Sequence, residues 1–118
     1  MEFVGRSDYQ ERNDCVVRAF SVVADKPYIE VHNDFKLAGR KTRCRTKFKV
    51  IDKVASQYGF EKVRCRMTVK RFLDDVAHIQ SVAAHISGHM FAVVNGEVTD
   101  LWPVNPRCIV TWYLQPKK

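Results

Sequence analysis

The sequence predicts an α+β fold, in which helices from the N-terminal half pack on an antiparallel sheet from the C-terminal half. Before residue 58, apolar residues recur at helical spacing in three stretches. The last third instead alternates in the manner of strands and contains Asn95-Gly96, the strongest short signal for a hairpin. With 118 residues, 46% of them hydrophobic and 28% charged, the chain fits one globular domain over 1–118.

Three helices are expected in the first half. The first runs from Cys15 to about Ala24, is apolar nearly all round, and follows Asn13 and Asp14, which are N-cap residue types. The second begins after Pro27 and stops near Gly39. The third covers about 48–58 and is closed by a glycine.

The second half is expected to consist of strands with one short helix. An alternating stretch over 60–67 predicts a strand, and Thr68 is placed to cap a helix that runs to about residue 76. Four further strands are expected over 81–86, 89–94, 97–102 and 108–114. This order of helices followed by antiparallel strands defines the fold class.

Positive charge is concentrated in the middle of the chain. The formal net charge is +7, but residues 36–71 hold 13 basic and only two acidic residues, a balance of +11. The remainder holds seven basic and 11 acidic residues, a balance of −4. Such a segment suits an acidic protein surface, nucleic acid or an anionic substrate, or it is simply a solvated face.

The four cysteines do not form a metal pattern. Cys15, Cys44, Cys65 and Cys108 are separated by 29, 21 and 43 residues, and zinc sites need two ligands at close spacing. The sequence predicts no metal site and no cofactor. The N-terminus lacks a signal-peptide layout and no stretch approaches 18 consecutive apolar residues, so a reducing cytoplasm without membrane attachment is expected.

Cys15, His89 and Asp100 form the candidate catalytic set. Cys15 begins the first helix, where the helix dipole stabilises a thiolate. If Asn95-Gly96 forms a two-residue turn, Asp100 faces Phe91 across the hairpin and is a diagonal neighbour of His89. A carboxylate that holds one imidazole nitrogen leaves the other free to take a proton from a thiol.

Structural alternatives accompany each member of this set. A cysteine at the start of a core helix is commonly a packing residue, and a His–Asp pair at a sheet edge is commonly structural. His85 is interpreted as a sheet histidine with a structural partner.

The residues around this set resemble papain-like cysteine peptidase domains. The resemblance rests on QERNDCVVRA at positions 10–19, SGHMFAVV at 87–94 with Gly96 and Asp100, and AGRK at 38–41. It is closest to bacteriocin-exporter-type peptidase domains and to small phage-encoded relatives, and it covers about residues 9–112.

The resemblance implies a papain-like fold with Cys15 as nucleophile, His89 as general base and Asp100 as its orienting partner. It also implies that Gln10 and the Cys15 amide form an oxyanion hole. Gln10 lies five residues before Cys15, where these peptidases have six, so Asn13 is the alternative donor.

Two functions follow. The first is a thiol hydrolase that cleaves a peptide, isopeptide or related amide bond in a protein or peptide substrate. The second is a catalytically silent, phage-encoded module that binds a host protein or nucleic acid in the host cytoplasm. In either case the basic segment is the predicted docking surface. Its partner-binding residues are Arg40, Lys41, Arg43, Arg45 and Lys47.

Overall fold

The computed structural model describes residues 14–41, 46–75, 81–100 and 104–116. Within them lie four helices and a five-stranded antiparallel sheet, which confirms the α+β class. The helices are α1 (Cys15–Ala24), α2 (Tyr28–Leu37), α3 (Phe48–Gln57) and α4 (Val69–Asp75). The strands are β1 (Phe60–Thr68), β2 (Val82–Ile86), β3 (His89–Val94), β4 (Glu97–Thr99) and β5 (Ile109–Pro116).

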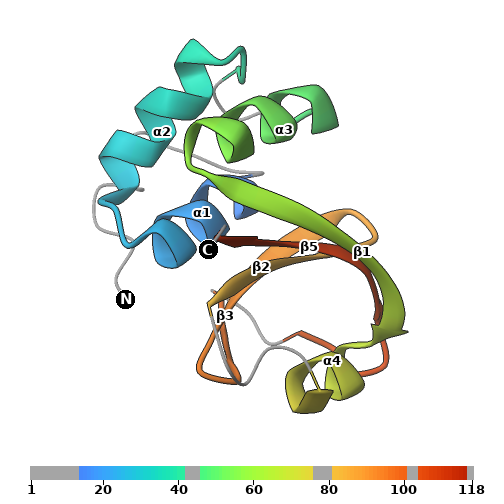
Figure 1. The fold of residues 1–118 in the computed structure, drawn as a ribbon. Coiled ribbons are helices and arrows are strands. Elements are labelled where there is room, and N and C mark those ends of the chain that lie inside the picture. The colour runs from blue at the N-terminus through green and yellow to red at the C-terminus, as the bar shows by residue number, and fades with distance from the viewer. Residues whose placement is uncertain (1–13, 42–45, 76–80, 101–103, 117–118) are drawn as a thin grey trace.

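The sheet has the strand order β1-β5-β2-β3-β4 (Figure 1). Strands β2, β3 and β4 follow one another along the chain as antiparallel hairpins. The last strand, β5, returns to lie between β1 and β2 and pairs with both. Chain segments that are far apart in sequence therefore pair at the β1-β5 side of the sheet, while the β2-β3-β4 side is built from local hairpins.

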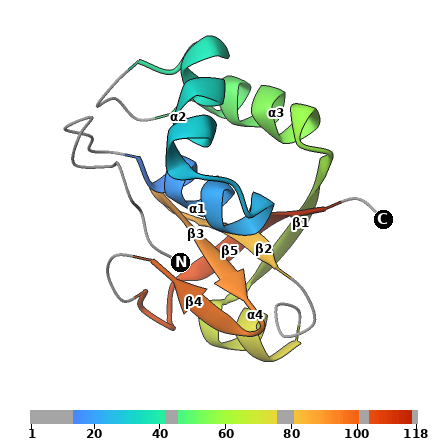
Figure 2. The ribbon, with the colours of Figure 1, turned by 90° about the vertical axis from the view of Figure 1, so that its left-hand side faces the viewer.

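Helix α1 lies between the sheet and α2, against β3 (Figures 1 and 2). Its nearly all-round apolar sequence suits this position, because neighbours cover it on opposite sides. One hydrophobic core joins α1, α2 and α3 to the strands, and Phe20 of α1 is fully buried in it. The first residue of α1 is Cys15, so this core fixes the position of the candidate nucleophile.

A second core lies between α4 and the strands. The backbone N–H of Arg71 donates to Oγ1 of Thr68 at 3.2 Å, which confirms Thr68 as the N-terminal cap of α4. Helix α4 runs from Val69 to Asp75; residue 76, where the sequence placed its end, lies outside the described residues.

The expected hairpin at Asn95-Gly96 is confirmed. Both residues have positive φ, at 52° and 81°, as a type I′ turn requires. Val94 pairs with Glu97 and Val93 with Val98, in the register that the turn predicts.

The expected extent of the following strand was wrong. Strand β4 ends at Thr99, and Asp100 lies in a bend just beyond it, so Asp100 does not pair with Phe91 in the ladder. Residue 102, the expected end of the strand, lies outside the described residues.

The three expected N-terminal helices are confirmed, but one cap works differently. Asp14 occupies the N-cap position of α1, yet its carboxylate makes no capping bond to the helix backbone. It is fully buried and engages two other side chains instead.

No helix within the described ranges is both long and apolar enough to cross a membrane.

Candidate active site

Cys15, His89 and Asp100 come together at one end of the sheet. Cys15 opens α1, His89 opens β3, and Asp100 follows β4. Asp100 accepts a hydrogen bond from Nε2 of His89 onto Oδ2 at 2.5 Å, and the His89 ring also hydrogen-bonds the Cys15 thiol. Because Nε2 is paired with Asp100, Nδ1 is the ring nitrogen available to the thiol. The structure thus brings the three predicted residues into one connected set.

The environment of Cys15 favours its thiolate. Burial alone would raise the pKa of the Cys15 thiol, but hydrogen bonds from His89 and from the backbone of Met90 lower it, as do the charges of His89 and Arg18. The net result is a pKa below the ordinary value. The position of Cys15 at the N-terminus of a ten-residue helix acts in the same direction.

His89 is correspondingly biased toward its protonated form. Hydrogen bonds to Asp100 and to Cys15 raise the pKa of His89 to about 9, against the opposing effect of burial. The pKa of Cys15 is thus lowered while the pKa of His89 is raised, and both changes favour the charged forms of the two side chains. A thiolate–imidazolium pair is therefore favoured above the lowered pKa of Cys15 and up to about pH 9, where the imidazolium loses its proton.

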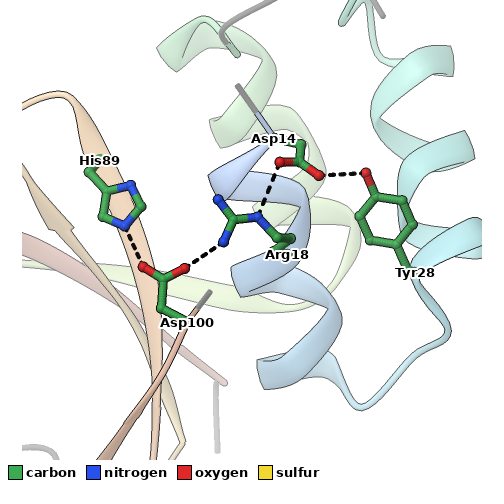
Figure 3. Close-up of polar contacts among 5 residues, drawn as sticks. All are labelled: Asp14, Arg18, Tyr28, His89 and Asp100. Atoms are coloured by element: carbon green, nitrogen blue, oxygen red, sulfur yellow. Dashed lines mark hydrogen bonds and ion pairs between the residues drawn. The ribbon is translucent and has the colours of Figure 1, made fainter. Parts of the chain in front are cut away.

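Asp100 is held from its other side by Arg18, a residue of α1 (Figure 3). Nη1 of Arg18 donates to Oδ1 of Asp100 at 2.5 Å, and Nε of Arg18 donates to Oδ1 of Asp14 at 3.1 Å. The hydroxyl of Tyr28 donates to Oδ2 of Asp14 at 2.7 Å. The carboxylate of Asp14, next to Cys15 in the sequence, is thus paired with the guanidinium of Arg18 and the phenol of Tyr28.

The neighbouring histidine has a structural environment. His85 lies 3.0 Å from Oγ1 of Thr111 through Nδ1, and its ring stacks on Trp112 with 4.6 Å between centroids. Burial and then the charges of Lys62 and His89 lower the pKa of His85. The interpretation of His85 as a sheet histidine with a structural partner is confirmed.

The remaining predicted site residues are placed only in part. The oxyanion candidates Gln10 and Asn13 lie outside the described residues, as do Arg43 and Arg45 of the docking surface. Lys41 and Lys47 are exposed. Arg40 is only 5% exposed, so its side chain belongs to the interior rather than to a docking surface.

Two further cysteines, Cys65 and Cys108, lie within the described residues. Cys65 and Cys108 are free thiols, and burial raises the pKa of Cys65. Cys44 lies outside the described residues. Within the described ranges, no three His, Cys, Asp or Glu side chains are grouped closely enough to hold a metal ion.

Comparison with protein-family models, curated proteins and solved structures found no match to this chain.

Sequence reasoning missed the participation of Arg18, Asp14 and Tyr28. In the sequence, Arg18 is only a polar residue that interrupts the otherwise apolar helix from Cys15 to about Ala24. The spacing of Asp14 and Arg18, four residues apart, is the one local signal that pairs them. The contact between Arg18 and Asp100 spans 82 positions in the sequence, and no local pattern indicates it.

Proposed function

We propose that the protein is a papain-like thiol hydrolase that cleaves a peptide, isopeptide or related amide bond. The observation that carries this proposal is the connected set of Cys15, His89 and Asp100, contributed by a helix N-terminus and two neighbouring strand ends. Nucleophile, base and orienting carboxylate each have the partner that their role requires. The helix bearing the nucleophile packs against a sheet bearing the base, which is the arrangement that the papain-like resemblance implies.

The geometry supports a two-stage reaction. The Cys15 thiolate attacks the carbonyl carbon of the amide, a C–S bond forms, and the carbonyl π electrons move to oxygen. When the tetrahedral intermediate collapses, the C–N bond breaks, and the His89 imidazolium protonates the departing amine. The acyl group is left on Cys15 as a thioester.

Water completes the cycle. Neutral His89 takes a proton from a water molecule as that water attacks the thioester carbonyl. The C–S bond then breaks, the acid is released, and the Cys15 thiolate faces the His89 imidazolium again. Asp100 keeps Nε2 of His89 engaged throughout, so that Nδ1 stays directed at the reacting atoms.

The start of α1 supplies a donor for the developing oxyanion. The first four backbone N–H groups of an α-helix have no partner within the helix, and the N–H of Cys15 is among them. A charge that develops on the attacked oxygen is stabilised by such a donor and by the helix dipole. Gln10 or Asn13 is proposed as the second donor.

The basic segment supports an acidic protein as substrate. The exposed side chains of Lys41 and Lys47 remain in the proposed docking surface, together with Arg43 and Arg45, whereas the buried Arg40 is removed from it. A cluster of exposed cations steers acidic partners toward the protein that carries it.

An acyl-enzyme experiment tests this function without knowledge of the natural substrate. The protein is incubated with 4-nitrophenyl acetate, and acetylated cysteines are identified by peptide mass spectrometry over time. We expect acetyl transfer to Cys15 followed by its release, whereas the Cys15→Ala variant loses this turnover. The matched Cys65→Ala variant is expected to behave as the wild type, because its thiol lies outside the set.

Two results would overturn the proposal. Acetylation of Cys65 or Cys108 as fast as that of Cys15 would show that Cys15 is not activated. A stable acetyl group on Cys15 that is never released would show that the site lacks hydrolysis, as expected of a catalytically silent module.

A further inference from the structure

Arg18 is a buried cation that links α1 to the proposed catalytic carboxylate. Its residue is 5% exposed, and the Asp14 and Asp100 side chains that it contacts are 0% and 4% exposed. A charge in such surroundings is tolerated only when it is paired and hydrogen-bonded, and breaking the pairing is costly. The three groups are therefore held in one arrangement rather than sampling many.

The two oxygens of Asp100 are divided between two partners. Oδ1 accepts from Nη1 of Arg18, and Oδ2 accepts from Nε2 of His89, both at 2.5 Å (Figure 3). A hydrogen bond to one oxygen of a carboxylate restricts the plane of the group, and the second oxygen is thereby oriented toward the other partner. This matters because Asp100 lies in a bend beyond β4, outside the hydrogen-bond ladder that fixes strand residues.

Arg18 is itself fixed at its other edge. Nε donates to Asp14, which also accepts the hydroxyl of Tyr28 from α2. A planar guanidinium presents several N–H donors in a rigid fork, so it can span two carboxylates in a defined geometry. A lysine ammonium is a point charge on a flexible stem and does not provide that span.

We infer that Arg18 is a positioning residue of the catalytic set, which orients the Asp100 carboxylate toward His89 from the same helix that carries the nucleophile. This inference rests on the proposed role of His89. Tyr28 and Asp14 support it by anchoring the guanidinium. Because Cys15 and Arg18 are one turn apart on α1, the helix sets the thiol and the orientation of its base together.

Replacing Arg18 by methionine separates positioning from simple charge. If Arg18 orients Asp100, Arg18→Met weakens the Asp100–His89 hydrogen bond, and the pKa of His89 falls from about 9 toward its ordinary 6.5. If Arg18 contributes only charge or packing, removing a cation leaves the pKa of His89 unchanged or raises it. The measurement is an NMR titration of the His89 ring, which needs no substrate.

The accompanying variants sharpen this test. Arg18→Lys keeps the cation but not the fork, and we expect it to leave the pKa of His89 lowered; it also serves if Arg18→Met does not fold. A double variant tests whether Arg18 acts through Asp100. When Asp100→Asn is already present, adding Arg18→Met is expected to slow the alkylation of Cys15 by less than about twofold more, because the effects of coupled residues are not additive. Arg71→Met, which removes an exposed arginine paired with Asp75, is the matched control.

A His89 pKa that stays at or above about 9 in both Arg18→Met and Arg18→Lys would overturn the inference. Full additivity of Arg18→Met and Asp100→Asn would overturn it as well. Neither result concerns the acetyl turnover of Cys15, so failure of this inference and failure of the proposed function are distinguishable.

Discussion

Replacing His89 by alanine is expected to slow acetyl turnover at Cys15 by about 10²- to 10⁴-fold at pH 7.5, the usual contribution of general acid–base catalysis. The variant removes the group whose hydrogen bond and charge lower the pKa of the Cys15 thiol. Without that hydrogen bond and charge the pKa of Cys15 is expected to rise, so the reactive thiolate becomes scarcer. The base that activates water for release of the acyl group is lost at the same time.

His85→Ala is the matched control, because His85 lies on the neighbouring strand but is engaged by Thr111 and Trp112. We expect it to retain turnover within about threefold of the wild type, since surface and structural substitutions outside the site leave its chemistry in place. Equal slowing by His85→Ala and His89→Ala would contradict the assignment of His89 as the base.

The second large effect is expected on stability, from Phe20→Ala. Phe20 is fully buried, and its ring lies 4.9 Å from Phe35, 5.9 Å from Tyr58 and 5.4 Å from Phe60, measured between centroids. Truncating such a side chain leaves a cavity and lowers the free energy of unfolding by about 3–5 kcal/mol. Because Phe20 joins α1 to α2 and β1, the variant also loosens the helix that carries Cys15 and Arg18.

Equilibrium unfolding in urea measures this loss. Leu37→Ala is the control, because Leu37 is 84% exposed and its truncation is expected to change the free energy of unfolding by no more than about 0.5 kcal/mol. A loss below about 1 kcal/mol for Phe20→Ala would mean that α1 is not fixed by this core.

Local patterns account for most of the elements. Apolar periodicity placed α1, α2 and α3, and the Asn95-Gly96 turn predicted the register of β3 and β4. Both signals act over a few residues, where backbone geometry leaves few choices. The pairing of β1 with β5 joins distant segments, and alternation alone does not indicate which strands become neighbours.

The sequence predicted which three residues form the candidate site, but not the contacts that hold them in place. Alternation continues past Thr99, so it does not show that β4 ends there or that Asp100 reaches His89 from a bend. Arg18 reads as a polar break in an apolar helix, whereas folding buries it against a carboxylate far along the chain. The partner of a buried charge is a tertiary property, and helical periodicity carries no information about it.

The pH dependence of Cys15 alkylation tests the central claim most directly. Iodoacetamide labelling of the wild-type protein is followed by mass spectrometry of the peptides containing Cys15 and Cys65, the second serving as an internal reference. Because His89 and its surroundings lower the pKa of Cys15, its labelling rate is expected to level off below pH 9, the ordinary pKa of a cysteine thiol. Burial raises the pKa of Cys65, so the labelling rate of Cys65 should still be rising at that pH. Parallel profiles for the two thiols, both rising through pH 9, would contradict an activated Cys15 and with it the proposed thiol hydrolase.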